Sequence, residues 1–131
     1  NDTFLMVEEI EHGELVINQP AGHLEPNESL LEAVIREVLE ETSYLTRPEA
    51  IVGLYQFQAP DAGPLYFRVC YLARVIEKTN QALDPDIQAA LWLTQAEIMQ
   101  RKHRSPLVTR CLEDYQSGHQ FSLERSALIL S

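Results

Sequence analysis

The sequence has few cysteines, few basic residues and no long apolar run, and each shortage excludes a class of protein. Two cysteines in 131 residues are too few for the disulfide framework of a small secreted domain. Ten basic against 20 acidic residues give a net charge of −10, which argues against binding a nucleic-acid polymer through a basic surface. No stretch approaches the roughly 20 apolar residues of a membrane-spanning helix, and no secretory leader is visible.

What remains is a globular chain of ordinary size. We expect one domain over residues 1–131, because 45% apolar residues is enough for a real core and no repeat or linker interrupts the chain. Cys70 and Cys111 lie in apolar segments and are predicted to be reduced core residues, with a disulfide between them as the alternative. Reduced cysteines fit a cytoplasmic protein.

Segments typical of strands alternate with segments typical of helices. Strands are predicted around residues 5–7, 14–17, 51–58, 64–76 and 89–93, and helices over about 29–43, from 94, and over 106–117. Hairpins are also expected, so this order favours an α/β fold with a mixed β-sheet covered by helices rather than a doubly wound parallel sheet. The chain starts in or next to a strand, which raises the suspicion that the intact protein has a further N-terminal strand.

The most informative segment is an amphipathic helix rich in glutamate. On a helical wheel, Glu37, Glu40 and Glu41 fall within an arc of about 100°, beside an apolar arc of about 140°. We expect the apolar arc to pack on the sheet, with the acids along its edge. Arg36 lies four residues after Glu32 and four before Glu40, a spacing at which helical ion pairs form.

Two interpretations of these acids compete. They are a solvated helix face, since like charges four residues apart cost only roughly 0.2–0.5 kcal/mol when exposed, or they hold a cation. The loop before the helix favours the cation, because the loop contains Gly22 and a glycine loop can bring backbone carbonyls close to a bound ion. Mg²⁺ suits this oxygen-rich set better than zinc, which prefers Cys and His. A magnesium site in turn points to phosphate chemistry.

The spacing of these residues resembles the Nudix box, over residues 22–44. The family motif is G-x5-E-x7-R-E-U-x-E-E-x-G-U, with U a bulky apolar residue. Its charged and first glycine positions are matched by Gly22, Glu28, Arg36, Glu37, Glu40 and Glu41. One position departs, because Ser43 stands where the family has its second glycine, and a positive φ there costs Ser about 1 kcal/mol. The departure touches none of the acids, so we expect altered geometry or stability rather than inactivity.

The resemblance implies a Nudix-type α/β/α sandwich and a role for each box residue. The implied ligands of Mg²⁺, or of Mn²⁺ in its place, are Glu37, Glu40, Glu41 and the carbonyl of Gly22. Glu37 is also a candidate base for the attacking water, and Arg36 would orient the acids through ion pairs. The implied catalytic set is therefore Glu37, Glu40, Glu41 and Arg36.

Charged residues outside the box are weaker candidates. In this family a further acid often comes from another loop, and Asp86 is the leading candidate for such a metal ligand, with Asp84 next. The alternative for either one is a plain turn beside Pro85. Arg68 and Arg104 are candidate phosphate contacts, with a solvated or structural role as the alternative.

Aromatic residues offer a further kind of contact. Tyr55, Phe57 and Tyr66 are candidates for stacking on a nucleobase, with a place in the core as the alternative. Trp92 is expected in the core. His23 lies in the box loop, where a role behind the ligands or facing solvent is expected, with a phosphate contact as the alternative.

The chain also resembles the NudJ-type subgroup of bacterial phosphatases, through residues 19–25, 104–108 and 115–118. This implies Mg²⁺-dependent hydrolysis of a phosphoanhydride bond in nucleoside tri- or diphosphates, or in a small pyrophosphate such as the thiamine pyrimidine precursor, by attack of water at phosphorus. The alternative is a Nudix-like domain that binds a nucleotide without cleaving it, and the complete set of box acids favours the enzyme. The implied partner is a small phosphorylated substrate, and the protein is expected to be a monomer or homodimer.

Overall fold

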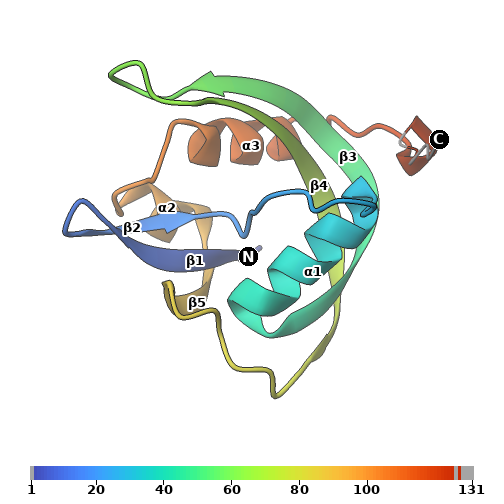
Figure 1. Ribbon diagram of the computed structural model, residues 1–131, viewed down its shortest axis with the longest axis horizontal. Coiled ribbons are helices and arrows are strands. Elements are labelled where there is room, and N and C mark those ends of the chain that lie inside the picture. The colour runs from blue at the N-terminus through green and yellow to red at the C-terminus, as the bar shows by residue number, and fades with distance from the viewer. Residues whose placement is uncertain (1, 126, 128–131) are drawn as a thin grey trace.

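The computed structural model describes residues 2–125 and residue 127 (Figure 1). The strands are β1 (Phe4–Glu11), β2 (Glu14–Asn18), β3 (Tyr44–Gln58), β4 (Leu65–Lys78) and β5 (Ile87–Leu93). The helices are α1 (Leu30–Thr42), α2 (Gln95–Met99), α3 (Leu107–Gln116) and a short 3-10 helix, η1 (Leu123–Arg125). Every predicted segment is present, and β1 and β3 are longer than expected. Within the described residues, no helix combines the length and hydrophobicity needed to cross a membrane.

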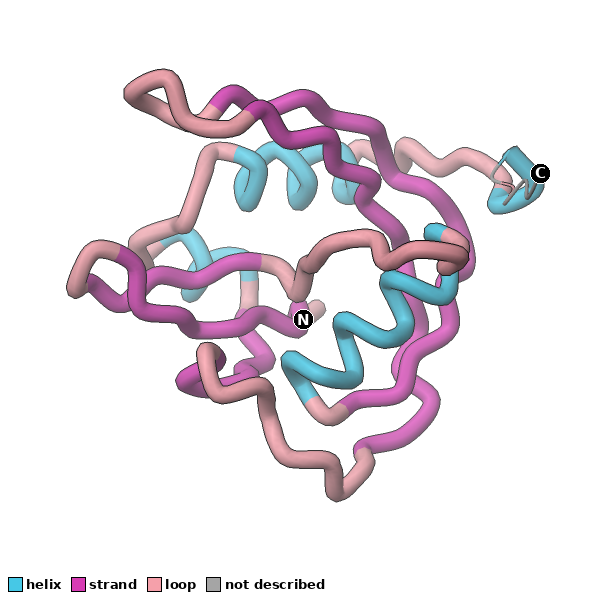
Figure 2. Tube along the Cα trace, viewed as in Figure 1, coloured by secondary structure: helices cyan, strands magenta, loops and turns pink. Residues whose placement is uncertain are grey.

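The strands form two antiparallel sheets. One sheet has the order β2-β1-β5, and the other is the long β3-β4 ribbon. Figure 2 shows the ribbon curving along one side of the molecule, with α1 and α3 on its concave side and the three-stranded sheet opposite. This arrangement of helices and sheets confirms the predicted α/β class, and it places α1 between the two sheets.

A buried apolar cluster joins the three-stranded sheet to α2 and α3. Its members are Met6, Ile17, Leu93, Ile98, Val108 and Leu112. Burying a side chain of this size contributes about 1.5–3 kcal/mol. The cluster therefore fixes β1 and β2, and with them the loop that leaves β2 toward α1.

The expectation that Trp92 lies in the core is wrong. Its side chain is 43% exposed, and its indole N–H donates to the Tyr44 hydroxyl at 3.0 Å. Side chains alternate between the two faces of a strand. Leu91 and Leu93 in β5 point inward, so Trp92 between them points outward.

Candidate active site

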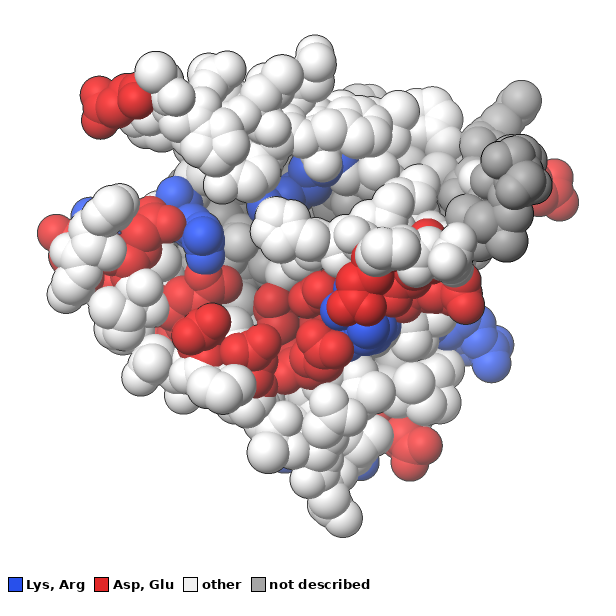
Figure 3. Space-filling view, in the orientation of Figure 1, with Lys and Arg blue, Asp and Glu red and all other residues white. Residues whose placement is uncertain are grey.

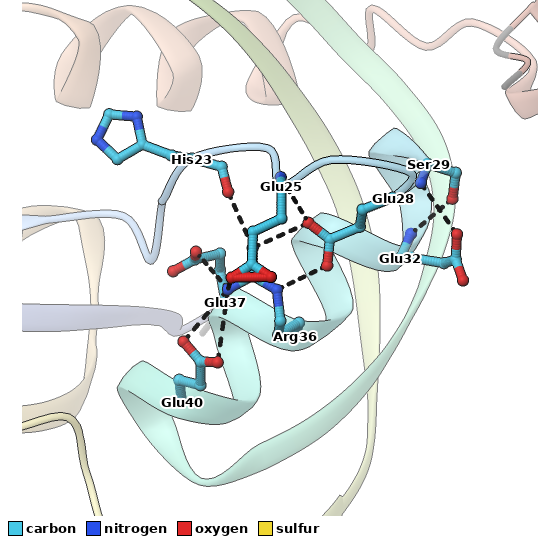
Figure 4. Close-up of polar contacts among 8 residues, drawn as sticks. All are labelled: His23, Glu25, Glu28, Ser29, Glu32, Arg36, Glu37 and Glu40. Atoms are coloured by element: carbon cyan, nitrogen blue, oxygen red, sulfur yellow. Dashed lines mark hydrogen bonds and ion pairs between the residues drawn. The ribbon is translucent and has the colours of Figure 1, made fainter. Parts of the chain in front are cut away.

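The box loop and α1 are joined at a well-defined helix start. The Ser29 hydroxyl accepts from the backbone N–H of Glu32 at 3.0 Å, and the Glu32 carboxylate accepts from the Ser29 N–H at 2.9 Å (Figure 4). Such a reciprocal capping box satisfies two otherwise unpaired donors and fixes where the helix begins. Glu32 is thus occupied at the cap and does not make the predicted ion pair with Arg36.

Helix α1 ends at Ser43, the position that departs from the family motif. Ser43 has φ 68° and ψ 7°, so the left-handed conformation expected of the family glycine is kept with a serine in its place. Its hydroxyl donates to the carbonyl of Gln81, and its carbonyl accepts from the N–H of Thr79 at 2.8 Å. A hydrogen bond of this kind contributes about 0.5–1.5 kcal/mol. The side chain therefore offsets the backbone strain that it brings.

Arg36 is the centre of an ion-pair network on α1 (Figure 4). Its guanidinium donates to Glu28 at 2.6 and 3.0 Å, to Glu37 at 2.7 Å and to Glu40 at 3.3 Å. It also donates to the carbonyl of His23 at 2.8 Å, which ties the loop to the helix. The Arg36 side chain is only 23% exposed, and the hydrogen bonds that it donates, above all those to Glu28, raise its pKa above the usual range. The same contact with Arg36 holds the pKa of Glu28 below its usual range.

Gly22 lies directly against the Glu37 carboxylate. A Cβ atom at position 22 would come within 1.9 Å of the Glu37 Cδ atom and 2.0 Å of Oε2. A larger residue at position 22 would require the Glu37 carboxylate to move. The backbone of the loop at Gly22 and the acid of the Arg36-Glu37 pair therefore lie in direct contact.

Glu41 differs from its neighbours on the helix, because its carboxylate is largely removed from water. Burial raises its pKa to about 7, and the nearby charges of Glu37, Glu9 and Asp84 act in the same direction. One backbone donor opposes this shift, the N–H of Ala21 at 3.1 Å. Glu41 is thus bonded to the loop residue beside Gly22, and it faces other acids rather than Arg36.

Two acids from outside the box, Asp84 and Glu9, raise the pKa of Glu41 through their charges. Asp86, the leading candidate from the sequence, is not one of them. Asp84 is held to the end of α1 by its N–H, which donates to the Glu40 carbonyl at 2.8 Å, and Glu9 comes from β1. Asp86 is exposed, and its N–H donates to the Asp84 carboxylate at 2.9 Å in a turn. Sequence reasoning ranked Asp84 second and did not consider Glu9. The position of Glu9 depends on the pairing of β1 with its neighbouring strands, which no local sequence pattern predicts.

The donor set fits a hard divalent cation by its chemistry. The carboxylates of Glu37, Glu40 and Glu41 and the loop backbone at Gly22 supply only oxygen atoms, which Mg²⁺ prefers. Figure 3 shows acidic side chains gathered in a band across α1 toward the β1-β2 hairpin. Among the described residues, no three acidic, His or Cys side chains converge closely enough to hold a metal ion as they lie. Arg36 pairs with two of the box carboxylates, those of Glu37 and Glu40.

A cavity of about 470 Å³ lies between β3 and the start of α3. Tyr55, Phe57 and Arg110 contribute to its lining, together with Pro106 and Leu107. The Arg110 guanidinium carbon lies 5.8 Å from the centre of the Tyr55 ring. The helix that walls this cavity is tied to the box loop, because the Gln19 side chain donates to the Val108 carbonyl at 2.9 Å.

Asp114 holds two of these lining residues in place. Its carboxylate accepts from the Tyr55 hydroxyl at 2.7 Å and from Arg110 Nε at 2.9 Å. These contacts, that of Tyr55 foremost, hold the pKa of Asp114 below its usual range. Sequence reasoning did not single out Asp114, because its contact with Tyr55 joins distant parts of the chain and its other partner, Arg110, forms an ordinary helical ion pair with it.

The remaining candidate residues from the sequence lie in different parts of the molecule. Phe57 and Tyr66 stack on each other with ring centres 6.4 Å apart. Arg104 pairs with Glu9 and lies 3.2 Å from the Glu11 carboxylate. Figure 3 shows basic side chains across a hollow from the acidic band. The ring of His23 points away from the ion-pair network in Figure 4, as expected for a solvent-facing residue.

Comparison with known proteins agrees with this geometry. The model of the NUDIX domain matches residues 1–111. The chain is 40% identical over 123 residues to phosphatase NudJ of Escherichia coli strain K12, covering 92% of this chain and 80% of that protein.

Solved structures give the same family. A NUDIX hydrolase from Nitrosomonas europaea superposes with a TM-score of 0.94 at 39% identity, covering 98% of this chain and 90% of that one. A UDP-X diphosphatase, at 16% identity and a TM-score of 0.72, covers 93% of this chain and 60% of its own and shares the fold. With the box residues assembled on one loop and helix, the chain belongs to the Nudix family, as an enzyme that acts on phosphorus-containing anhydrides.

Proposed function

We propose that this enzyme hydrolyses a phosphoanhydride bond in nucleoside tri- or diphosphates, or in a related small pyrophosphate such as the thiamine pyrimidine precursor, with Mg²⁺ as cofactor. The observation that carries the proposal is the contact of Gly22 with Glu37, where a Cβ atom at position 22 would overlap the carboxylate in its present position. Glu41 is bonded to the same loop through Ala21. The relatives named phosphatase NudJ support the substrate class by their similarity.

In this proposal the box residues have different roles: metal binding, proton acceptance and positioning. Glu37, Glu40, Glu41 and the Gly22 carbonyl hold Mg²⁺, for which Mn²⁺ can substitute, and Asp84 is favoured over Asp86 as an acid from outside the box. Bound Mg²⁺ neutralises phosphate charge and lowers the pKa of a coordinated water. Glu37 accepts the proton of the attacking water, a role typically worth 10²- to 10⁴-fold. Arg36 positions Glu37 and Glu40 through the ion pairs described above.

The organic part of the substrate is assigned to the cavity between β3 and α3. Tyr55 and Phe57 offer aromatic surface there, and such surfaces stack on bases of any sequence. Arg110 adds a positive charge at the rim. Since the Gln19 side chain donates to the Val108 carbonyl, the helix that walls the cavity is hydrogen-bonded to the loop that leads to Gly22.

A substrate panel tests the proposal. Purified protein is assayed with Mg²⁺, with Mn²⁺ and with chelator, against nucleoside di- and triphosphates and thiamine-pathway pyrophosphates. We expect metal-dependent release of orthophosphate or pyrophosphate. Running the reaction in ¹⁸O-labelled water and weighing the products identifies the phosphorus that is attacked. Binding of nucleotide and Mg²⁺ with no product from any substrate would defeat the proposal.

Two variants separate the cavity from the metal site. Phe57→Ala should raise KM for nucleotides with little change in kcat, because it removes contact area away from the reacting phosphate. Leu65→Ala, on the exposed part of β4, is the matched control for loss of an apolar side chain from the same ribbon. If both variants keep the parent KM, the assignment of the cavity fails while the metal site stands.

A further inference from the structure

The two cysteines of the chain meet in one apolar cluster. Cys70 lies in β4 and Cys111 in α3, and neither is in a disulfide. Cys111 is buried together with Tyr55 and Leu107, and Cys70 packs against the same cluster beside Phe57. Distant positions in the sequence thus become neighbours.

The thiols also interact directly. Cys70 and Cys111 form a hydrogen bond that raises the pKa of Cys70 and lowers the pKa of Cys111, as expected when Cys70 donates and Cys111 accepts. Burial opposes ionisation at both sites, and the positive charge of Arg68 favours it at both. Accepting this bond favours the thiolate at Cys111, and the thiolate is the form that attacks a peroxide.

We propose that Cys70 and Cys111 are an oxidation site, at which a peroxide converts the neighbouring thiols into an intramolecular disulfide that ties β4 to α3. The contact of the two side chains within one cluster carries this inference. It does not rest on the proposed hydrolytic function.

The chemistry balances with one peroxide and two thiols. The Cys111 thiolate attacks one oxygen of hydrogen peroxide, the O–O bond breaks, and the departing hydroxide takes up a proton to leave as water. Cys111 then carries a sulfenic acid. The Cys70 sulfur attacks the Cys111 sulfur, the S–S bond forms and the S–O bond breaks. The second hydroxide takes the Cys70 proton and leaves as water, so the two sulfurs supply the two electrons that reduce the peroxide.

The cavity described above provides the approach. Tyr55 and Leu107 line the cavity and also contact the thiol cluster, so a molecule as small as peroxide in the cavity is one side chain away from Cys111. The disulfide would close a long loop of chain, and such cross-links stabilise mainly by restricting the unfolded state. Oxidation should therefore stiffen the junction between the β3-β4 ribbon and α3.

Mass spectrometry of the whole protein tests the inference. The reduced chain is treated with hydrogen peroxide, quenched and weighed without reductant. We expect a loss of about 2 Da, disappearance of both free thiols, a cross-linked peptide pair containing Cys70 and Cys111, and full reversal by dithiothreitol. Because the chain has two cysteines only, each signal has a single assignment. The apparent Tm of the oxidised protein should rise by roughly 7–15 °C.

Single variants give the controls. Cys70→Ser should lose the mass change and accumulate a Cys111 adduct with a sulfenic-acid trap such as dimedone, whereas Cys111→Ser should give much less adduct at Cys70. Cys70→Ala and Cys111→Ala replace the serine variants if a buried hydroxyl unfolds the protein. Thiols that stay free, separate oxidation of each cysteine to sulfinic acid, or a disulfide only between two chains would each overturn the inference.

Discussion

In the second half of α1, Arg36 balances the carboxylates of Glu37 and Glu40 together with that of Glu28 from the preceding loop, whereas Glu41 faces other acids and one backbone N–H. The same helix therefore has its acidic charge neutralised around Arg36 and uncompensated around Glu41. Burial raises the pKa of Glu41 to about 7, which means that its ionised form is held at a cost. A bound divalent cation would remove that cost. In our proposal, Arg36 therefore positions the carboxylates and Glu41 gains most from metal binding.

The largest effect should come from Glu41→Gln. Gln keeps the size of the side chain but removes the charge, so we expect kcat/KM to fall by roughly 10²- to 10⁴-fold, comparable to the loss of a group that acts on the reacting water. Steady-state kinetics with Mg²⁺ measures this. Glu77→Gln, at an exposed position of β4, controls for the loss of one carboxylate. A Glu41→Gln enzyme with parent-like activity would remove Glu41 from the ligand set.

Gly22→Ala tests the contact between the loop and the first acid. The new methyl group would collide with the Glu37 carboxylate, so Mg²⁺ affinity should fall by roughly 10- to 100-fold while the fold persists. Calorimetric titration with Mg²⁺ gives the affinity. Gly13→Ala is the contrasting control, because Gly13 has a positive φ of 78° but no atom within 4 Å of a new Cβ. It should cost stability and leave Mg²⁺ affinity unchanged.

Arg36→Gln removes the positive charge that pairs with the carboxylates of Glu28, Glu37 and Glu40. Three partly buried carboxylates would lose their counter-charge, and we expect the free energy of unfolding to fall by about 1–3 kcal/mol. Arg74→Gln is the matched control, since Arg74 is 63% exposed and pairs with Glu49 alone, and it should change stability by less than about 0.5 kcal/mol. Urea titrations compare the two. Equal effects would mean that the Arg36 network adds no more than a surface ion pair.

The pH dependence of stability tests the other side of the comparison, the uncompensated carboxylate of Glu41. The pKa of Glu41 is raised from its ordinary 4.5 to about 7, so its contribution to stability is fully present below pH 4.5 and is lost as the pH rises through about 7. The metal-free Glu41→Gln protein lacks this loss, and its stability relative to the parent should increase between pH 5 and 8. Parallel curves for the two proteins across that range would contradict the raised pKa.

The smallest effect should be at Ser43, where α1 ends. Ser43→Gly relieves the strain of the left-handed backbone but loses the hydrogen bond to Gln81, so the two terms nearly cancel and stability should stay within about 1 kcal/mol of the parent. Ser43→Ala keeps the strain and loses the bond, and should be less stable than Ser43→Gly by about 1 kcal/mol. Thermal unfolding orders the three proteins. An alanine variant as stable as the glycine variant would show that the strain is negligible.

Local patterns in the sequence predicted most of the elements and their ends. The predicted helix over about 29–43 agrees with α1, and the motif predicts the left-handed residue at its end, because both depend on neighbours within a few positions. The exposed position of Trp92 was missed, since its apolar character outweighed the strand alternation that puts it outside. Glu9 and Asp114 were missed because their roles depend on contacts between distant segments.

The sequence by itself determined the family motif, the helix that carries it and the identity of every box acid, because these follow from spacing along one continuous segment. The tertiary structure decided which acids share a partner. Arg36 pairs with Glu28 and Glu37 rather than with Glu32, and Asp84 lies beside the end of α1. Cys70 packs against the cluster that contains Cys111. These outcomes depend on distances across the fold, and a charge or a thiol acts on whatever lies next to it in space.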